Sequence, residues 1–255
     1  MPSETPSRHV ATPAPRSTVR QFARPRTLPE QIADHLGMAI LRGEYREGER
    51  VGEQEVAEAY SVSRGPVREA IRMLASRGIV RLEPRRGATA IAISLDVVAD
   101  LFNVRSVLFG LAGRCFTRSA APPAFERLAE RLRHLRQIMA LDASDPIEFA
   151  LAVGRVGAAI YNQCGNPTLV RLLHEQGQTS LWGFIWREGP LDYATLERRA
   201  SCLEHWMAIE AAARNGNEAL AEAHLRQIIL ESRDAVLASL ADTRGGSVDQ
   251  SKLLR

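Results

Sequence analysis

Three arginines at helical spacing are the residues of this sequence best suited to binding an anionic polymer. Arg64, Arg68 and Arg72 are four residues apart, so one face of a helix would carry all three. The basic sequence Arg85-Arg86-Gly87 follows shortly afterwards. A guanidinium donates two parallel hydrogen bonds to a phosphate or to a guanine edge, so this set is typical of contact with DNA.

The segments around these arginines predict a helix-turn-helix followed by a hairpin. Val67, Ala70, Ile71 and Leu74 lie opposite the arginines on the same helix and are spaced to pack on a core. Ser63 is expected to be the N-cap of that helix. Helices are expected at about 29–42, 53–59 and 64–78, a glycine-punctuated connection at 43–52, and β-prone runs at 79–83 and 88–93. This order predicts a winged helix whose third helix reads DNA.

Beyond Ser94 the apolar pattern is helical almost to Ala241. Helices are expected at about 95–119, 123–141, 145–163, 167–187, 192–215 and 217–241. The short connections favour an antiparallel bundle. The predicted fold class is mainly α, an N-terminal winged helix-turn-helix plus a C-terminal antiparallel α-helical bundle. The predicted domains are a disordered basic tail at 1–27, a DNA-binding domain at 28–93, an all-helical effector-binding and dimerisation domain at 94–241, and a flexible tail at 242–255.

Composition limits the classes of protein that remain. The 255 residues are 45% hydrophobic and 25% charged, which is typical of a globular protein. Residues 1–27 carry five arginines and one glutamate, whereas 28–93 carry ten of each sign, so the basic charge is local. No apolar run reaches membrane-spanning length and no secretory signal is recognisable. The three separated cysteines are expected to be reduced thiols, which predicts a cytoplasmic protein without a membrane partner.

The run VSRGPVREAIRMLASRGIVRLEPRRGA at 62–88 resembles the recognition helix and wing of bacterial GntR-superfamily transcription regulators of the FCD type. LFNVRSVLFGLAGRCFTRSA, GNPTL at 165–169 and the run 206–216 resemble the helical domain of that subfamily. The resemblance covers about residues 28–240. It implies DNA contacts from Gln54, Ser63, Arg64, Gly65, Arg68, Arg86 and Gly87. Gln54 stands where arginine is common and Gly65 where threonine is common, so we expect a changed operator sequence.

The resemblance also implies a divalent metal in the bundle, held by one aspartate and three histidines. The aligned positions here are Val153, Gly157, Trp206 and Ile228. None of these side chains coordinates a metal, so no metal and no other cofactor is predicted. Trp206 has a large indole, whereas Gly157 has no side chain. This pairing indicates that the indole fills the space that the metal would leave empty.

Histidines elsewhere leave a rearranged metal site open as an alternative. His205 precedes the expected position by one residue, His174 is on a neighbouring helix, and His224 lies one turn before Ile228. Ordinary surface or hydrogen-bonded histidines are the other interpretation.

Arg105 matches an arginine that lines the effector cavity in the resembling proteins. A guanidinium inside a bundle needs an acidic partner or an anionic ligand, and both remain open here. Three tryptophans (Trp182, Trp186 and Trp206) either wall an apolar pocket or belong to the core. The candidate effector-binding residues are Arg105, Trp206, His224 and Ile228.

These observations predict a sequence-specific DNA-binding repressor whose operator affinity responds to a small-molecule effector. Since helix-turn-helix dimers read palindromes, a homodimer joined through its helical domains is expected. The alternative is a DNA-binding regulator whose helical domain is a filled scaffold that binds no effector. A protein partner, or the abundance of the regulator itself, would then control its activity. No Ser-His-Asp pattern, phosphate-cradling glycine loop or HExxH motif is recognisable, so an enzyme is not expected.

Overall fold

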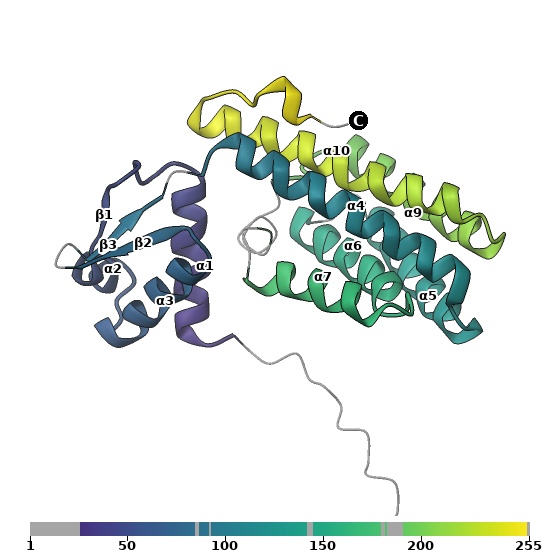
Figure 1. The fold of residues 1–255 in the computed structure, drawn as a ribbon, viewed down its shortest axis with the longest axis horizontal. Coiled ribbons are helices and arrows are strands. Elements are labelled where there is room, and N and C mark those ends of the chain that lie inside the picture. Colours follow the sequence, from purple (N-terminus) through teal and green to yellow (C-terminus); the bar gives the residue numbers. More distant parts are fainter. Residues whose placement is uncertain are drawn as a thin grey trace, which may run out of the picture.

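The computed structural model describes residues 26–84, 87–91, 93–141, 145–179, 182 and 191–253. It has two lobes, a small one with three helices around a short sheet and a larger helical bundle (Figure 1). The predicted fold class is confirmed: the described chain is mostly helical, with a winged helix followed by a bundle of antiparallel helices.

The small lobe combines three helices with a three-stranded antiparallel sheet. Its elements are α1 (Leu28–Leu41), β1 (Arg50–Val51), α2 (Glu53–Ala59), α3 (Arg64–Ser76), β2 (Val80–Glu83) and β3 (Gly87–Ala90). The strand order is β1-β3-β2, and Thr89 is opposite Arg50 on one side and Arg81 on the other. The predicted hairpin is therefore present, but β1 lies in a segment that was expected to be a connection. Two residues are too few to show a strand period.

The core of the small lobe forms where α3 packs against α1. Val67, Ile71 and Leu74 of α3 are buried, as their spacing predicts, and Leu36 of α1 is buried with them. Asp34 is also fully buried in this lobe. Its carboxylate is 2.8 Å from Arg26 Nη1 and 3.6 Å from Arg77 Nη1, which offsets the cost of burying the charge.

The bundle is built from long helices joined by short loops. It contains α4 (Leu95–Ser119), α5 (Pro122–Met139), α6 (Pro146–Tyr161), α7 (Pro167–Thr179), α9 (Leu196–Arg214) and α10 (Glu218–Arg244). Ser94 caps α4 by accepting a hydrogen bond from the Val97 N–H. No helix among the described residues is long and apolar enough to cross a membrane.

Several helix ends differ from the sequence prediction by one to four residues. The helix expected from residue 192 begins at Leu196, because Tyr193 has a φ of 65° and the Thr195 hydroxyl caps the Arg198 N–H. The helix expected at 167–187 is described to Thr179, and most of its expected remainder, including Trp186, lies outside the described residues.

The long helices α4 and α10 run antiparallel along the whole bundle (Figure 1). Their ends near the small lobe bring the two lobes into contact, since Arg244 Nη1 of α10 donates a hydrogen bond to the Leu41 carbonyl of α1 at 2.9 Å. A last-turn carbonyl of α1 has no partner within its own helix, so this bond satisfies it from the other lobe.

Within the predicted flexible tail, residues 249–252 fold back along the first turns of α4. Asn103 Nδ2 donates to the Lys252 carbonyl at 2.7 Å, and Lys252 Nζ is 2.8 Å from an Asp100 carboxylate oxygen. The Asp249 N–H donates to Asp96 Oδ1 at 2.8 Å. The short 3-10 helix η1 (Gln250–Lys252) is formed in this segment.

Candidate nucleic-acid interface and bundle cavity

The N-terminal half of α3 presents the candidate DNA-contacting residues to solvent. Ser63 is the N-cap residue, as predicted, but its hydroxyl accepts no capping hydrogen bond and the residue is exposed. Arg64 and Arg68 follow on the same face, with 57% and 52% of their side chains exposed. A Cβ at Gly65 would meet nothing within 4 Å, so the backbone there is open to a close approach. This end of α3 has the shape and charge of a major-groove reader.

Glu53, the first residue of α2, joins the two arginines. Arg64 Nη2 donates to Glu53 Oε2 at 3.0 Å, and Arg68 donates to both oxygens at 3.1 Å. Hydrogen bonds from Arg68 and then Arg64 lower the pKa of the Glu53 carboxyl. The sequence did not reveal this role, because Glu53 is 11 and 15 residues away from its partners. Neighbouring Gln54 donates to Glu58 Oε1 at 2.7 Å within its own helix.

The wing carries one described candidate. Gly87 begins β3 with a φ of 84°, a conformation that side chains with a Cβ rarely adopt. The predicted contact from Arg86 lies outside the described residues.

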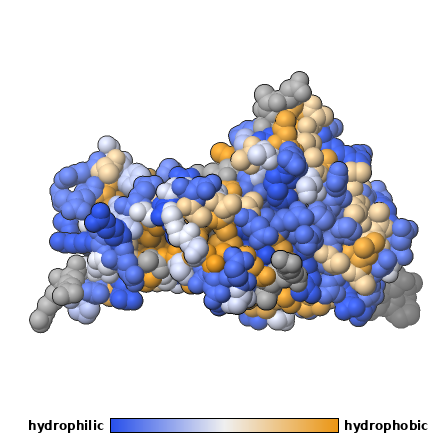
Figure 2. All heavy atoms as spheres, turned by 90° about the horizontal axis from the view of Figure 1, so that it is seen from above, coloured by the Kyte–Doolittle hydropathy of each residue, from blue (hydrophilic) through white to orange (hydrophobic). Residues whose placement is uncertain are grey.

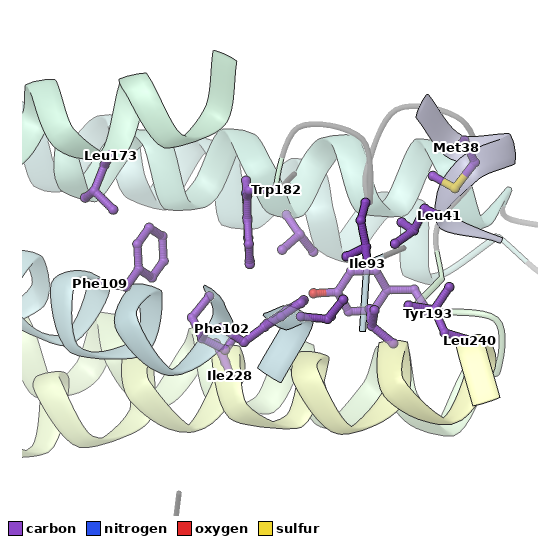
Figure 3. Packing of buried hydrophobic residues seen from close by; sticks show 14 of the residues in the cluster. Met38, Leu41, Ile93, Phe102, Phe109, Leu173, Trp182, Tyr193, Ile228 and Leu240 are labelled. Atoms are coloured by element: carbon purple, nitrogen blue, oxygen red, sulfur yellow. The ribbon is translucent and has the colours of Figure 1, made fainter. Parts of the chain in front are cut away.

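A cavity of about 1040 Å³ lies between the bundle helices and extends to the small lobe. Four positions that the family resemblance selected all line it: Val153 and Gly157 of α6, Trp206 of α9 and Ile228 of α10. Arg105 of α4 and Trp182 line the same space. Figure 3 shows Phe109 projecting from α4 toward Leu173 of α7, Trp182 next to Phe102, and Ile228 on α10.

The residues at these four positions do not fit the metal that the resemblance implies. They offer no imidazole or carboxylate, and the described residues contain no group of three potential ligands close enough to share an ion. A side chain of α4 occupies the space that a side chain at position 157 would need. A Cβ on Gly157 would lie 2.7 Å from Phe109 Cζ and 3.7 Å from Trp206 Cη2. Phe109 is therefore the nearer compensating residue, and most of the cavity stays open.

His224 does not line the cavity, contrary to its prediction as an effector-binding residue. Its ring packs against α9, where His205 Nδ1 is 2.9 Å from His224 Nδ1 and His205 Nε2 is 2.9 Å from Glu231 Oε1. Burial and the neighbouring His205 lower the pKa of His224. A four-residue step on a helix rotates the side chain by about 40°, so His224 and Ile228 need not face the same cavity.

The other end of the cavity is bounded by the small lobe. Arg26 before α1, Glu30 and Asp34 within α1, and Arg77 after α3 line it. The space between the bundle helices therefore extends to the winged helix, where α1 and the residue after α3 border it.

The two lobes define a winged-helix protein with an all-helical second domain. Residues 28–89 match the profile of the bacterial regulatory proteins of the gntR family, and residues 100–231 match that of the FCD domain. The chain belongs to the GntR family of bacterial regulatory proteins and carries an FCD domain.

Individual relatives match shorter parts of the chain. The gluconate operon transcriptional repressor of Bacillus subtilis is 31% identical over 119 residues, 47% of this chain and 49% of the relative. The Bacillus licheniformis protein of the same name is 38% identical over 78 residues, 31% of this chain and 32% of the relative. The chain thus spans half or less of the length of these relatives.

Two solved structures share the fold. One is of Lar, described as controlling expression of the Listeria monocytogenes agr system, with a TM-score of 0.58 and 20% identity. The other is E. coli McbR/YncC, with a TM-score of 0.55 and 20% identity. Each alignment covers 84% of this chain and 98% of the solved chain.

Proposed function

We propose that this chain is a sequence-specific DNA-binding transcriptional repressor, and that a small molecule bound in the bundle cavity modulates its affinity for the operator. The observation that carries the proposal is the pair Arg64 and Arg68, exposed side by side on the first turns of α3. Each guanidinium can exchange Glu53 for a phosphate or a guanine edge. Ser63 and Gly65 leave the backbone beside them accessible to DNA. A DNA partner supports the further proposal that the protein works in the bacterial cytoplasm.

The cavity supports control by an effector over the alternative of a filled scaffold. Phe109 and Trp206 occupy part of the space, yet about 1040 Å³ remains, enough for a metabolite-sized ligand. The cavity borders Asp34 and Arg77 of the small lobe, so a ligand could favour one placement of the DNA-binding head over another. The family consists of regulatory proteins, and we assign no enzymatic activity to this chain.

A homodimer joined through α4 is part of the proposal. Apolar residues repeat along the outer face of α4 with alternating steps of four and three residues, as in a coiled coil. The members of this α4 stripe are Val97, Leu101, Val104, Leu108 and Leu111. Val97 and Val104 are 53% and 54% exposed, an unfavourable exposure that a second copy would remove. Hydrophobic patches also interrupt the hydrophilic surface of the molecule in Figure 2. Two-fold symmetry would present two α3 helices to a palindrome.

Salt-dependent DNA binding tests the assignment. Fluorescence anisotropy would measure binding to a duplex from the region upstream of the protein's own coding sequence, at several salt concentrations. Arg64→Ala and Arg68→Ala should each weaken binding about tenfold or more, and removal of one guanidinium from a phosphate should reduce the salt slope by about one. Arg136→Ala, an equal change of charge at the end of α5, should bind like the wild type. Wild-type affinity and slope in both α3 variants would contradict the proposal.

A further inference from the structure

The three-stranded sheet of the small lobe brings two arginines together on its outer face. Arg50 of β1 and Arg81 of β2 are both opposite Thr89 of the central strand β3, one on each side. Their chain neighbours Val51 and Val80 are buried, so the alternation along each strand turns both arginines to solvent. Arg50, Thr89 and Arg81, which we call the wing row, therefore cross all three strands on one face.

The two guanidiniums of the wing row have no acidic partner within the described residues. They line a concavity of about 520 Å³. Glu47 and Glu83 border the same space, yet in the described chain neither forms an ion pair with an arginine of the row. The Thr89 hydroxyl is 3.5 Å from the Arg81 carbonyl, the long limit of a hydrogen bond, so it can turn to a better acceptor. The row thus offers three donors to an anion.

Arg50 lies beside Gly87, the candidate DNA contact at the start of β3. A Cβ on Gly87 would be 4.0 Å from Arg50 Nε, so the arginine side chain extends along β3 from Thr89 toward Gly87. Since Gly87 has no side chain, nothing at that position covers the guanidinium. A wing that enters a groove has a sugar-phosphate strand on each side of it. The wing row is therefore placed where a phosphate would lie.

The spacing of the row suits a single phosphate. Neighbouring strands are about 5 Å apart, so the Cα atoms of Arg50 and Arg81 are separated by about 10 Å across β3. Two long side chains can converge over that distance, and Thr89 lies between them. Guanidinium forks and a hydroxyl are common donors to phosphate oxygens.

We propose that the wing row binds a backbone phosphate of the DNA, with Arg50 and Arg81 as the charged donors and the Thr89 hydroxyl between them. This inference rests on the proposed function, because it adds a second contact surface to the same DNA complex. Phosphate contacts fix the register of a protein on a duplex and carry no base identity. The wing row therefore strengthens binding to operator and random DNA equally, whereas α3 provides the preference for the operator.

Anisotropy titrations of the full-length protein test the wing row, with the duplex from upstream of its coding sequence and a random duplex of equal length. Arg50→Ala and Arg81→Ala should each weaken binding to both duplexes about threefold to tenfold and reduce the salt slope by about one. Arg50→Lys should keep the wild-type slope, because an ammonium also pairs with phosphate. Thr89→Val should weaken binding about threefold at an unchanged slope. Arg46→Ala, an equal change of charge before β1, should bind like the wild type.

Phosphate ethylation interference separates a DNA contact from a structural role. Ethylation removes the charge of one phosphate at a time, and it should block the wild type at a phosphate beside the groove that receives the wing. The Arg50→Ala/Arg81→Ala double variant should lose this interference and keep the rest of the pattern. If the arginines only maintained the sheet, the melting temperature would fall and the pattern would stay as in the wild type.

Several results would overturn the wing row. These are wild-type affinity and slope in the double variant, a loss confined to the upstream duplex, an unchanged interference pattern, or an equal loss in Arg46→Ala. The two proposals fail separately. If the double variant binds like the wild type and Arg64→Ala does not, the wing row fails and the regulator assignment stands. If Arg64→Ala and Arg68→Ala both keep wild-type binding, the regulator assignment fails, and if the wild type binds neither duplex, both proposals fail.

Discussion

Glu53 holds Arg68 through both of its carboxylate oxygens, at 3.1 Å from Nε and 3.1 Å from Nη2. The same carboxylate accepts a bond from Arg64. The two arginines that we assign to DNA recognition are thus oriented, in the absence of DNA, by the first residue of the preceding helix. Since hydrogen bonds from these arginines lower the pKa of Glu53, the carboxylate remains ionised at neutral pH and competes with DNA phosphates.

Glu53→Gln should therefore tighten binding to random-sequence DNA by about threefold, because an exposed ion pair that competes with phosphate is removed. Preference for the operator over random DNA should fall, since the arginines lose the group that orients them. Glu55→Gln on the same helix changes the charge equally without a hydrogen bond to either arginine. Anisotropy titrations of both variants would decide the matter, and equal effects would show that only net charge counts.

Gly157 and Phe109 form a close contact that predicts a strong substitution effect. Gly157→Ala places its methyl group 2.7 Å from Phe109 Cζ, so it should lower the free energy of unfolding by about 1–3 kcal/mol. Gly154→Ala, one turn earlier on α6 with open space around it, should be neutral or stabilising by up to about 1 kcal/mol.

Urea unfolding of a double-mutant cycle would check this contact. Gly157→Ala combined with Phe109→Leu should cost less than the sum of the two single changes, because the shorter side chain gives way to the methyl group. Strict additivity would mean that the two residues do not compete for this space.

The α4 stripe predicts the oligomeric state. Val104→Glu combined with Leu111→Glu places two charges in the proposed interface, and the protein should become monomeric in light scattering coupled to size-exclusion chromatography. Leu141→Glu is the control, because Leu141 is 58% exposed after the end of α5 and outside the stripe. A dimeric double variant, or a monomeric wild type, would exclude α4 as the joining helix.

Arg244 connects the end of α10 to the end of α1. Arg244→Ala removes the bond to the Leu41 carbonyl and should lower the free energy of unfolding by about 1 kcal/mol. Amide hydrogen exchange in the last turn of α1 should accelerate as well. Thr243→Ala is a suitable control, since that hydroxyl donates to the Ser239 carbonyl within α10. Similar exchange rates in both variants would argue that Arg244 does not fasten the two lobes.

The sequence was most informative where a local signal coincides with an element's end. The bounds of α2 and α4 were predicted to the residue, because turn residues or a capping serine stand at their ends. Apolar spacing likewise predicted the buried face of α3, from Val67 to Leu74. In the bundle, the family resemblance selected Val153, Gly157, Trp206 and Ile228, and the structure gathers all four around one cavity.

Relationships between distant segments could not be read from local pattern. Glu53 meets Arg64 and Arg68 only through the angle between α2 and α3, and β1 exists only because β3 pairs with it. The direction of His224 depends on how α10 rolls against α9, which spacing within one helix does not determine.

In-vitro selection from a random duplex library tests the central claim most directly, with the wild type compared with the Arg64→Ala/Arg68→Ala double variant. The wild type should enrich an inverted repeat whose two halves match the two α3 helices of a dimer. The double variant should remain dimeric and enrich no sequence. Failure of the wild type to enrich any sequence, or enrichment of the same repeat by the double variant, would contradict the assignment of this face of α3 as the reader of DNA.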